Sequence, residues 1–312
     1  MRRSASRAPF HAGRAIFLAL LAALAATGGV CRRPPLGAGA AGISDATGAA
    51  VRVPERPARI VSLAPALTEA LFRLGAGDRV VGVTTYCNRP ARAARVEKVG
   101  TLFLADAEKI VSLHPDLVLC GLYGDPKPVL RLRDLGLCVF ALPEGRTFSE
   151  VRESYLLLGR LAGLPEEARR SLEEAEARLR AVDERLRGRT PVTVFVQLGA
   201  NPLITAGEGT FVDDVVRRSG GDNLGARIGP KYPQVGPETV VGLNPDVVLV
   251  APMEGSAGEA ETSAWKVFSS LSAVRTGRIH AVPADDLCRP DPFAFASSVE
   301  AVARLLHPGA FR

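Results

Sequence analysis

The sequence is poor in histidine. Its 312 residues include four histidines, which are scattered along the chain as His11, His114, His280 and His307. A site for zinc or manganese needs several histidine and carboxylate ligands that converge, and this spacing gives no sign of convergence. The sequence therefore predicts no metal site.

The chain also lacks the short motifs that mark common classes of enzyme. It has no glycine-rich phosphate loop, no nucleophile elbow and no paired-histidine motif, and its carboxylates are scattered. The sequence therefore predicts no catalytic residues and no enzymatic activity. An exported α/β enzyme without a recognisable motif is the alternative from another functional class.

Acidic residues are absent from the first 40 positions, which hold six of the 39 lysines and arginines. In the rest of the chain, 33 basic side chains balance 33 acidic ones, so the pI of about 9.3 reflects the terminal segment. A balanced body gives no electrostatic case for a nucleic acid partner.

The same segment has the layout of an export signal. An Arg-rich start precedes the apolar run AIFLALLAALAA, residues 15–26, which is too short for a membrane span, and small residues follow. We expect residues 1–40 to be a signal peptide and linker, with cleavage after Ala25 or after Ala40. Alternatively, Cys31 becomes a lipidated N-terminus that anchors the chain on the outer face of the membrane. Both outcomes predict an exported, periplasmic protein.

Short apolar runs alternate with helical patterns along the body of the chain. Residues 59–83, RIVSLAPALTEALFRLGAGDRVVGV, read as strand, helix and strand. Residues 108–120 (EKIVSLHPDLVLC) and 238–250 (ETVVGLNPDVVLV) are identical at seven of thirteen positions, and each reads as a short helix, a Pro-Asp turn and a buried strand. This internal repeat predicts two similar α/β lobes, residues 41–146 and 190–312.

Residues 147–189 are helical almost throughout and are expected to connect the lobes. The second helix, from Pro165 to Arg187, is about 34 Å long at 1.5 Å per residue. A helix of this length can cross from one lobe to the other, which predicts limited hinge motion. The alternative is a helix that packs on one lobe only.

Longer motifs carry a family resemblance. They are DATGAAVRVPERPARIVSLAPALTEALFRLG, VVGVTTYCNRP, FVDDVVRRSGGDNL and SLSAVRTGRIHAVPADDLCRPDP, together with the two repeat copies. On these motifs the chain resembles substrate-binding proteins of ABC importers, in the class that serves cobalamin, haem and ferric siderophores. The resemblance implies two Rossmann-like α/β lobes joined by one long α-helix, a ligand cleft between the lobes, and no resident cofactor. YPQVGPETV, NPLITAG and the loop at Tyr86 are most similar to the cobalamin-binding members.

The resemblance also implies a ligand site. Tyr86 and Tyr232 would form opposite aromatic walls that stack on a large flat ligand, with Tyr232 standing where cobalamin binders tend to carry Trp. Asp285 and Arg289 would bind the amide fringe of a corrin or each other. The other implied site residues are Cys87, Phe103, Tyr123 and Ile204. Cobalamin binders carry further aromatics at the positions of Leu102, Gly121 and Ile204, and Phe103 and Tyr123 are the nearby residues that would substitute.

Four cysteines lie in the body of the chain. Cys120 and Cys138 fall in apolar strands and are expected to be buried, inert thiols. Cys87 and Cys288 flank the implied ligand walls, one in each lobe. A disulfide that locks the lobes together, a soft metal contact and two free thiols are all open, and two free thiols is the interpretation that we favour.

The repeat places Glu108 and Glu238 at equivalent positions, each at the start of a helix. The helix dipole favours a carboxylate there, so simple capping is one role. The resemblance implies a second role, in which the two glutamates meet arginines on the transmembrane subunits of an ABC importer. The protein itself is expected to be a monomer.

Overall fold

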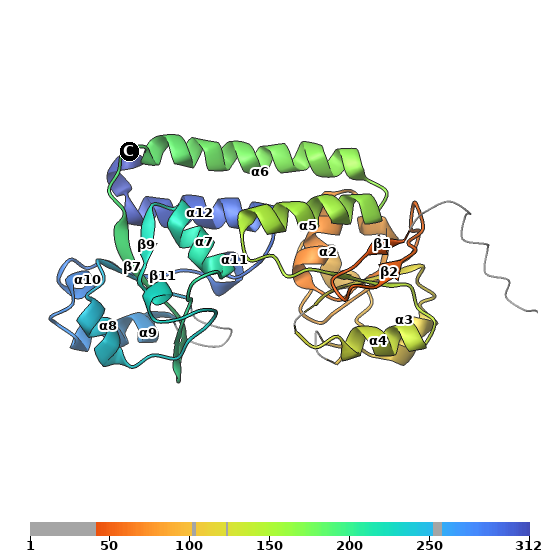
Figure 1. Cartoon of the computed structure of the whole chain (residues 1–312), viewed down its shortest axis with the longest axis horizontal. Coiled ribbons are helices and arrows are strands. Elements are labelled where there is room, and N and C mark those ends of the chain that lie inside the picture. Colours follow the sequence, from red (N-terminus) through yellow and green to blue (C-terminus); the bar gives the residue numbers. More distant parts are fainter. Residues whose placement is uncertain (1–41, 102–103, 123, 252–257) are drawn as a thin grey trace, which may run out of the picture. The chain divides into compact units, whose positions relative to one another are not determined.

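Four short apolar strands form the first sheet. They pair in parallel in the order β4 (Val80–Val83), β3 (Ile60–Ser62), β5 (Leu117–Gly121) and β6 (Val139–Leu142). The computed structural model describes residues 42–101, 104–122, 124–251 and 258–312 (Figure 1). Helices connect and cover these strands: α2 (Pro65–Arg73), α3 (Ala107–Ser112), α4 (Lys127–Asp134) and α5 (Phe148–Leu161).

The alternation of side chains along β5 explains the two helical layers. Leu117 and Leu119 point into a core that includes α2 and α5, whereas Val118 points into a core that includes α3 and α4. All three side chains are fully buried. A strand that is buried on both faces reads as a continuous apolar run, which is how this strand appears in the sequence.

The second sheet is centred on β7 (Val192–Ala200). Its order is β11 (Ile279–Ala281), β10 (Val247–Val250), β7 and β8 (Leu203–Thr205), and β9 (Gly221–Asn223) also pairs with β7. β8 is antiparallel to β7, and the other pairings are parallel. The helices of this lobe are α7 (Phe211–Arg218), α8 (Pro237–Leu243), α9 (Gly258–Ala264), α10 (Ser272–Arg275), α11 (Ala284–Leu287) and α12 (Pro292–Leu306). The 3₁₀ turns of the chain are Gly77–Arg79, Ala93–Arg95, Leu224–Arg227, Trp265–Val267 and Pro308–Ala310.

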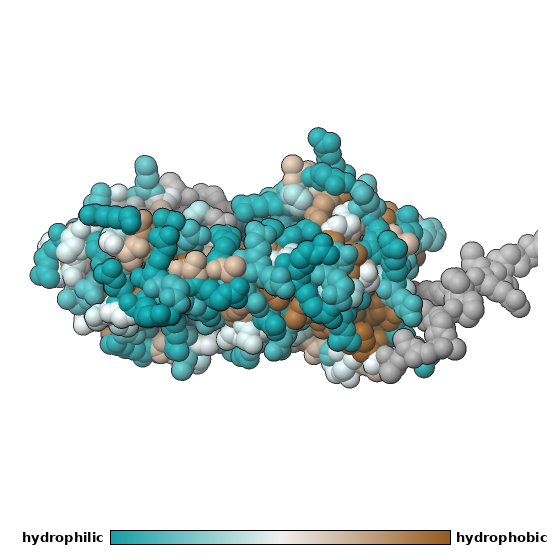
Figure 2. All heavy atoms as spheres, turned by 90° about the horizontal axis from the view of Figure 1, so that it is seen from above, coloured by the Kyte–Doolittle hydropathy of each residue, from teal (hydrophilic) through white to brown (hydrophobic). Residues whose placement is uncertain are grey.

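The predicted connecting helix is α6 (Pro165–Leu186). Its buried residues recur every three or four positions: Ala168, Leu172, Ala175, Leu179 and Val182. Ion pairs flank this stripe on both sides, from Glu176 to Arg152 of α5 at 2.8 Å and from Arg178 to Glu300 of α12 at 3.2 Å. α6 therefore packs on elements of both lobes (Figure 1). Figure 2, which looks onto this side of the molecule, shows a largely hydrophilic surface.

The fold class is confirmed as two α/β lobes, the first with a parallel sheet and the second with a sheet that is parallel except for β8. By its contacts the chain divides into Met1–Ala40 and Ala41–Arg312. The lobe boundaries at residues 146 and 189 stay predictions. The signal segment and Cys31 lie outside the described residues, and within the described ones no helix is long and apolar enough to cross a bilayer.

The two repeat copies fold alike. α3 and α8 each carry a glutamate as their second residue, and each helix is followed by a residue with left-handed backbone, His114 and Asn244, both at φ 47°. The carboxylates of Asp116 and Asp246 then accept backbone N–H groups at the start of β3 and β7, at 3.0 and 3.3 Å. Each copy is thus a helix, turn and strand unit that is anchored to the neighbouring parallel strand.

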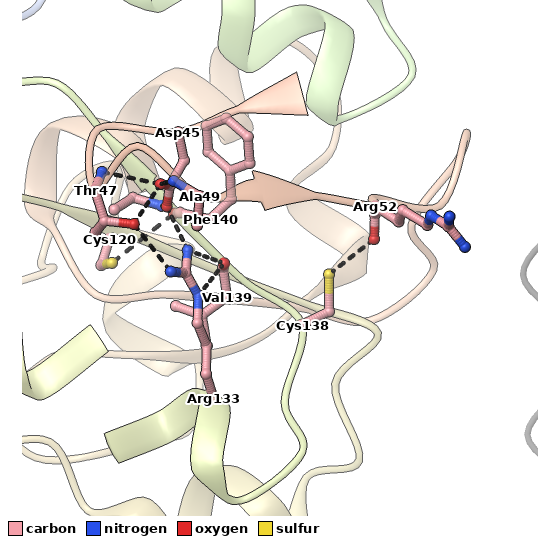
Figure 3. Close-up of polar contacts among 10 residues, drawn as sticks. Asp45, Thr47, Ala49, Arg52, Cys120, Arg133, Cys138, Val139 and Phe140 are labelled. Carbon is pink, nitrogen blue, oxygen red and sulfur yellow. Dashed lines mark hydrogen bonds and ion pairs between the residues drawn. The ribbon is translucent and has the colours of Figure 1, made fainter. Parts of the chain in front are cut away.

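A hairpin of β1 (Ile43–Ser44) and β2 (Ala50–Val51) lies beside β6 (Figure 3). Asp45 holds it there, because its buried carboxylate accepts the N–H groups of Thr47 at 2.9 Å and Ala141 at 3.0 Å and pairs with Arg133. Burial alone would raise the pKa of Asp45, but these hydrogen bonds and the guanidinium outweigh it and hold the pKa below 3.8. The hairpin therefore covers backbone groups of a strand that would otherwise end the sheet.

Candidate functional site

Tyr86 lies on a tight turn at the carboxyl end of β4. The N–H of Cys87 donates to the carbonyl of Thr84 at 3.1 Å and closes the turn. The turn is anchored by the buried Cys87 thiol, which lies 3.2 Å from the Thr68 hydroxyl and 3.1 Å from the Thr84 hydroxyl. Lys98 Nζ also donates to the Cys87 carbonyl. Tyr86 itself is 52% exposed, so an aromatic ring stands on a fixed support, which lowers the ordering cost of binding.

Tyr232 lies on a loop of the second lobe that runs beside β8. This loop is held by backbone hydrogen bonds from Thr205 to Pro233 at 3.1 Å and from Gly207 to Lys231 at 2.7 Å. Gly207 is required there, because the carbonyl of Gly229 lies where a Cβ would stand. Tyr232 is also 52% exposed. The two predicted wall residues therefore come from different lobes, and each stands on a loop with defined backbone contacts.

Ionisable groups from both lobes lie near Tyr232. Partial burial raises the pKa of Tyr232, and the nearby acidic groups of Cys288 and Glu144 raise it further. Glu144 follows β6 of the first lobe, and Cys288 follows α11 of the second. The hydroxyl of Tyr232, like that of an ordinary tyrosine, is protonated at neutral pH and can donate a hydrogen bond.

Charged side chains link the two lobes, and one of them, Arg89, lies three residues after Tyr86. Arg289 pairs with Glu69 of α2 and, at 3.2 Å, with Asp285 of α11. Asp285 in turn pairs with Arg89 of the Tyr86 loop at 3.3 Å. We call Glu69, Arg289, Asp285 and Arg89 the interlobe ion network. The predicted contact between Asp285 and Arg289 is present, and through Arg89 it reaches the loop that carries Tyr86.

The cysteines at the site are thiols in different surroundings. Cys87, which the resemblance implies as a site residue beside the Tyr86 wall, is 1% exposed and is part of the support under Tyr86, and its contact with a ligand stays a prediction. Cys288 is exposed as a residue, but desolvation of its thiol, with a smaller effect of Asp285, raises its pKa to about 11. Neither forms a disulfide, in agreement with the favoured interpretation of two free thiols. A thiol with so high a pKa is protonated and unreactive at neutral pH.

Of the remaining predicted ligand residues, Ile204 lies within the part of the chain that the structure describes, and the others do not. Ile204 is half-buried on β8, where it bridges to Gln234 of the Tyr232 loop. Phe103 and Tyr123 lie outside the described residues, as does Leu102. Contact of any of these residues with a ligand stays a prediction.

Sequence reasoning missed Glu69, Arg89 and Glu144. Glu69 lies 220 positions from Arg289, and Arg89 lies 196 positions from Asp285, so no local spacing relates the partners. The available signal was position alone, because Arg89 is only three residues after Tyr86 and both lie in the loop at the carboxyl end of a strand.

The predicted docking residues are exposed and equivalent. Glu108 and Glu238 each occupy the second position of a short helix, where the dipole favours a carboxylate. The structure therefore agrees with a favourable interaction of both carboxylates with the helix dipole, although the N-cap hydrogen bond of α3 is made by Asp106, and a contact with a transporter stays a prediction. Among the described residues, no group of three or more His, Cys, Asp or Glu side chains is placed to hold a metal ion.

Comparison with known proteins gives a consistent result. Residues 60–285 match the model of the periplasmic binding protein family. The chain is 30% identical over 278 residues to an uncharacterised ABC transporter substrate-binding lipoprotein, YvrC of Bacillus subtilis, covering 86% of each chain. It is 30% identical over 236 residues to the vitamin B12-binding protein of Vibrio cholerae, covering 75% of this chain and 84% of that one.

Solved structures are similar across both lobes. The periplasmic vitamin B12-binding protein BtuF of Vibrio cholerae has a TM-score of 0.71 at 30% identity, with 82% of this chain and 98% of that chain covered. The periplasmic haem-binding protein RhuT of Roseiflexus sp. RS-1 has a TM-score of 0.71 at 26% identity, with coverage of 81% and 98%.

Proposed function

The chain belongs to the periplasmic binding protein family, as a substrate-binding protein of an ABC importer, and we propose that its ligand is a cobalamin-like corrinoid. One observation carries the proposal: two half-exposed tyrosines, Tyr86 and Tyr232, stand on anchored loops of different lobes. Aromatic faces bury wide apolar area while losing few rotamers, which suits a flat macrocycle.

The relatives support this ligand and also define the second candidate. The vitamin B12-binding protein of Vibrio cholerae is 30% identical to this chain over 236 aligned residues. The haem-binding protein of Roseiflexus shares the fold at 26% identity, which favours haem, or a ferric siderophore, as the alternative ligand in the same role.

The place of action follows from the proposed role. Residues 1–40 serve as the export signal, and the mature protein works in the periplasm, or on the outer face of the membrane if Cys31 carries a lipid. It works as a monomer with the transmembrane subunits of the importer, which it meets through Glu108 and Glu238.

The ligand can be tested without choosing it in advance. The protein is purified under native conditions from the envelope of its own cells, and its absorption spectrum is recorded before any ligand is added. A corrinoid spectrum is the expected result. A haem or ferric siderophore spectrum contradicts the ligand and leaves the importer role intact.

A further inference from the structure

Lys98 lies in the segment to which the loop that carries Tyr86 returns. Resting on the proposed function, we infer that Lys98 is a positioning residue, which fixes this loop for ligand binding and acts on the affinity through Tyr86. Its ammonium donates to the carbonyl of Cys87 at 3.0 Å and to the carbonyl of Ala93 at 3.2 Å. The loop in question is residues 84–95, which follow β4.

The backbone of Lys98 is fixed at the edge of the first sheet. The N–H of Val83 donates to the carbonyl of Glu97, and the N–H of Val99 donates back to the carbonyl of Val83, both at 2.9 Å, so this segment runs parallel to β4. Successive side chains of an extended segment point to opposite faces. Val99 is fully buried in the core that includes α3, so Lys98 points to the other face, where Cys87 belongs to the core that includes α2.

The two carbonyls that Lys98 holds belong to opposite limbs of the loop. Cys87 directly follows Tyr86, and Ala93 begins the 3₁₀ turn that leads back to the sheet. Both residues are buried, and the N–H of Cys87 closes the tight turn with the carbonyl of Thr84. One ammonium therefore holds the two limbs together, and Tyr86 lies on the limb that is fixed on both sides.

A lysine suits this position because its ammonium offers three donors at the end of a long apolar stem. Two carbonyl oxygens from different parts of the chain can each accept one of these N–H groups. Lys98 is half-buried, and hydrogen bonds from a charged donor are stronger than neutral ones, the more so away from water. Loss of the ammonium would leave two carbonyls of buried residues without this partner.

A fixed loop matters for affinity because a ligand can stack only on a ring that is in place. Tyr86 is 52% exposed, so little packing holds its ring and its position depends on the backbone beneath it. When a loop takes its binding conformation for only part of the time, the apparent affinity falls by that fraction. Lys98 thus reduces the ordering cost of binding, and its whole effect on the ligand passes through Tyr86.

A double-mutant cycle tests this route. Calorimetry measures the affinity of the mature protein for cyanocobalamin, with Lys98→Met introduced into the parent, into Tyr86→Ala and into Tyr232→Ala. Methionine keeps an apolar stem and removes the donors. We expect about a tenfold loss of affinity in the parent and in Tyr232→Ala, as for a hydrogen bond to a charged group, and less than about a twofold loss in Tyr86→Ala.

Two further variants complete the test. Lys98→Gln also removes the ammonium and is carried through the same cycle, so the result does not depend on the folding of one variant. Lys109→Met is the matched control: Lys109 belongs to α3 and pairs with Glu97, the neighbour of Lys98, on the other face of the segment. It removes an ammonium from the same lobe and should leave the affinity unchanged.

Two results would overturn the inference while the proposed function stands. One is parent affinity in Lys98→Met, and the other is an equal loss with and without the Tyr86 ring. If cyanocobalamin does not bind to the parent, the proposed ligand is wrong. The same cycle is then run with haemin or a ferric siderophore, whichever binds, and equal losses again contradict the inference. If none of the three binds, the inference and the proposed function are both wrong.

Discussion

Among single residues, Tyr86 and Tyr232 are the ones on which the proposed ligand site depends. Each is half exposed, so truncation removes little core packing. Tyr86→Ala and Tyr232→Ala should each weaken cobalamin binding by about 1 to 3 kcal/mol, the range for losing one large apolar side chain from a pocket. Calorimetry gives the affinities, and thermal unfolding of the ligand-free protein should change little.

A buried tyrosine provides the control for this prediction. Tyr155 of α5 is 3% exposed and its hydroxyl lies 2.8 Å from that of Ser171. Tyr155→Ala should lower the thermal midpoint clearly, because it leaves a cavity in the core. Equal loss of stability in Tyr86→Ala or Tyr232→Ala, with unchanged affinity, would place those residues in the same structural category as Tyr155.

The sequence and its resemblance predict part of this site. They give the contact between Asp285 and Arg289, whereas ligand contact of the two tyrosines and of Ile204 stays a prediction. They place Cys87 beside the Tyr86 wall without giving the direction of its side chain, and the structure directs its thiol toward the hydroxyls of Thr68 and Thr84. They give no partner for Arg289 in the first lobe, because such a pairing is decided by how the lobes pack and not by local spacing.

At the scale of elements, the hairpin of β1 and β2 depends on one buried carboxylate. Asp45→Asn removes the charge that Arg133 and several N–H groups stabilise, and should cost about 1 to 3 kcal/mol of unfolding free energy at neutral pH. The pKa of Asp45 is lower in the folded protein than its ordinary value of 3.8, so its contribution is complete well above pH 4 and declines as the pH falls from there through the folded value.

Urea unfolding at several pH values checks this prediction. The difference in unfolding free energy between the parent and Asp45→Asn should be largest near neutral pH and should shrink below pH 4. A difference that stays constant down to pH 3 would show that the carboxylate charge does not stabilise the hairpin.

The repeat leads to a second prediction for an element. His114 has a left-handed backbone at φ 47°, which glycine adopts without strain and a β-branched residue strongly resists. His114→Val should reduce the unfolding free energy by about 1 to 2 kcal/mol, whereas His114→Gly should be neutral or slightly stabilising. Equal stability of the two variants, measured by urea unfolding, would mean that the turn is not constrained there.

The elements are predicted better than their contacts. The repeat copies and the two connecting helices follow from apolar spacing and from turn residues such as Pro165 and the Pro-Asp pairs. The hairpin at residues 43–51 does not follow, since its two-residue strands carry too short a pattern. Its place is set by Asp45 through contacts with residues 88 and 96 positions away.

At the scale of the whole molecule, two exposed glutamates in equivalent positions suit a two-fold partner. Glu108→Arg, Glu238→Arg and the double variant should keep the parent affinity for ligand, and they should lose ligand-dependent stimulation of the ATPase of the reconstituted importer. The loss should be greatest in the double variant, since like charges then meet at both contacts. Full stimulation by the double variant would leave the glutamates as helix caps only.

The connection between the lobes predicts limited motion. α6 packs on α5 and α12, and Arg73 of α2 stacks on Phe293 of α12 with the guanidinium carbon 3.7 Å from the ring centre. Together with the interlobe ion network, these contacts join the lobes at several places. We therefore expect binding to change local contacts more than to rotate the lobes.

The central claim is that this binding protein takes a corrinoid between Tyr86 and Tyr232. Isothermal titration calorimetry of the mature, ligand-free protein with cyanocobalamin tests it most directly, with haemin and a ferric siderophore titrated in parallel. We expect saturable one-site binding of cyanocobalamin that is tighter than the binding of haemin. Both tyrosine variants should bind cyanocobalamin more weakly than the parent protein does. Tight binding of haemin or of the siderophore, with no heat from cyanocobalamin, would contradict the central claim.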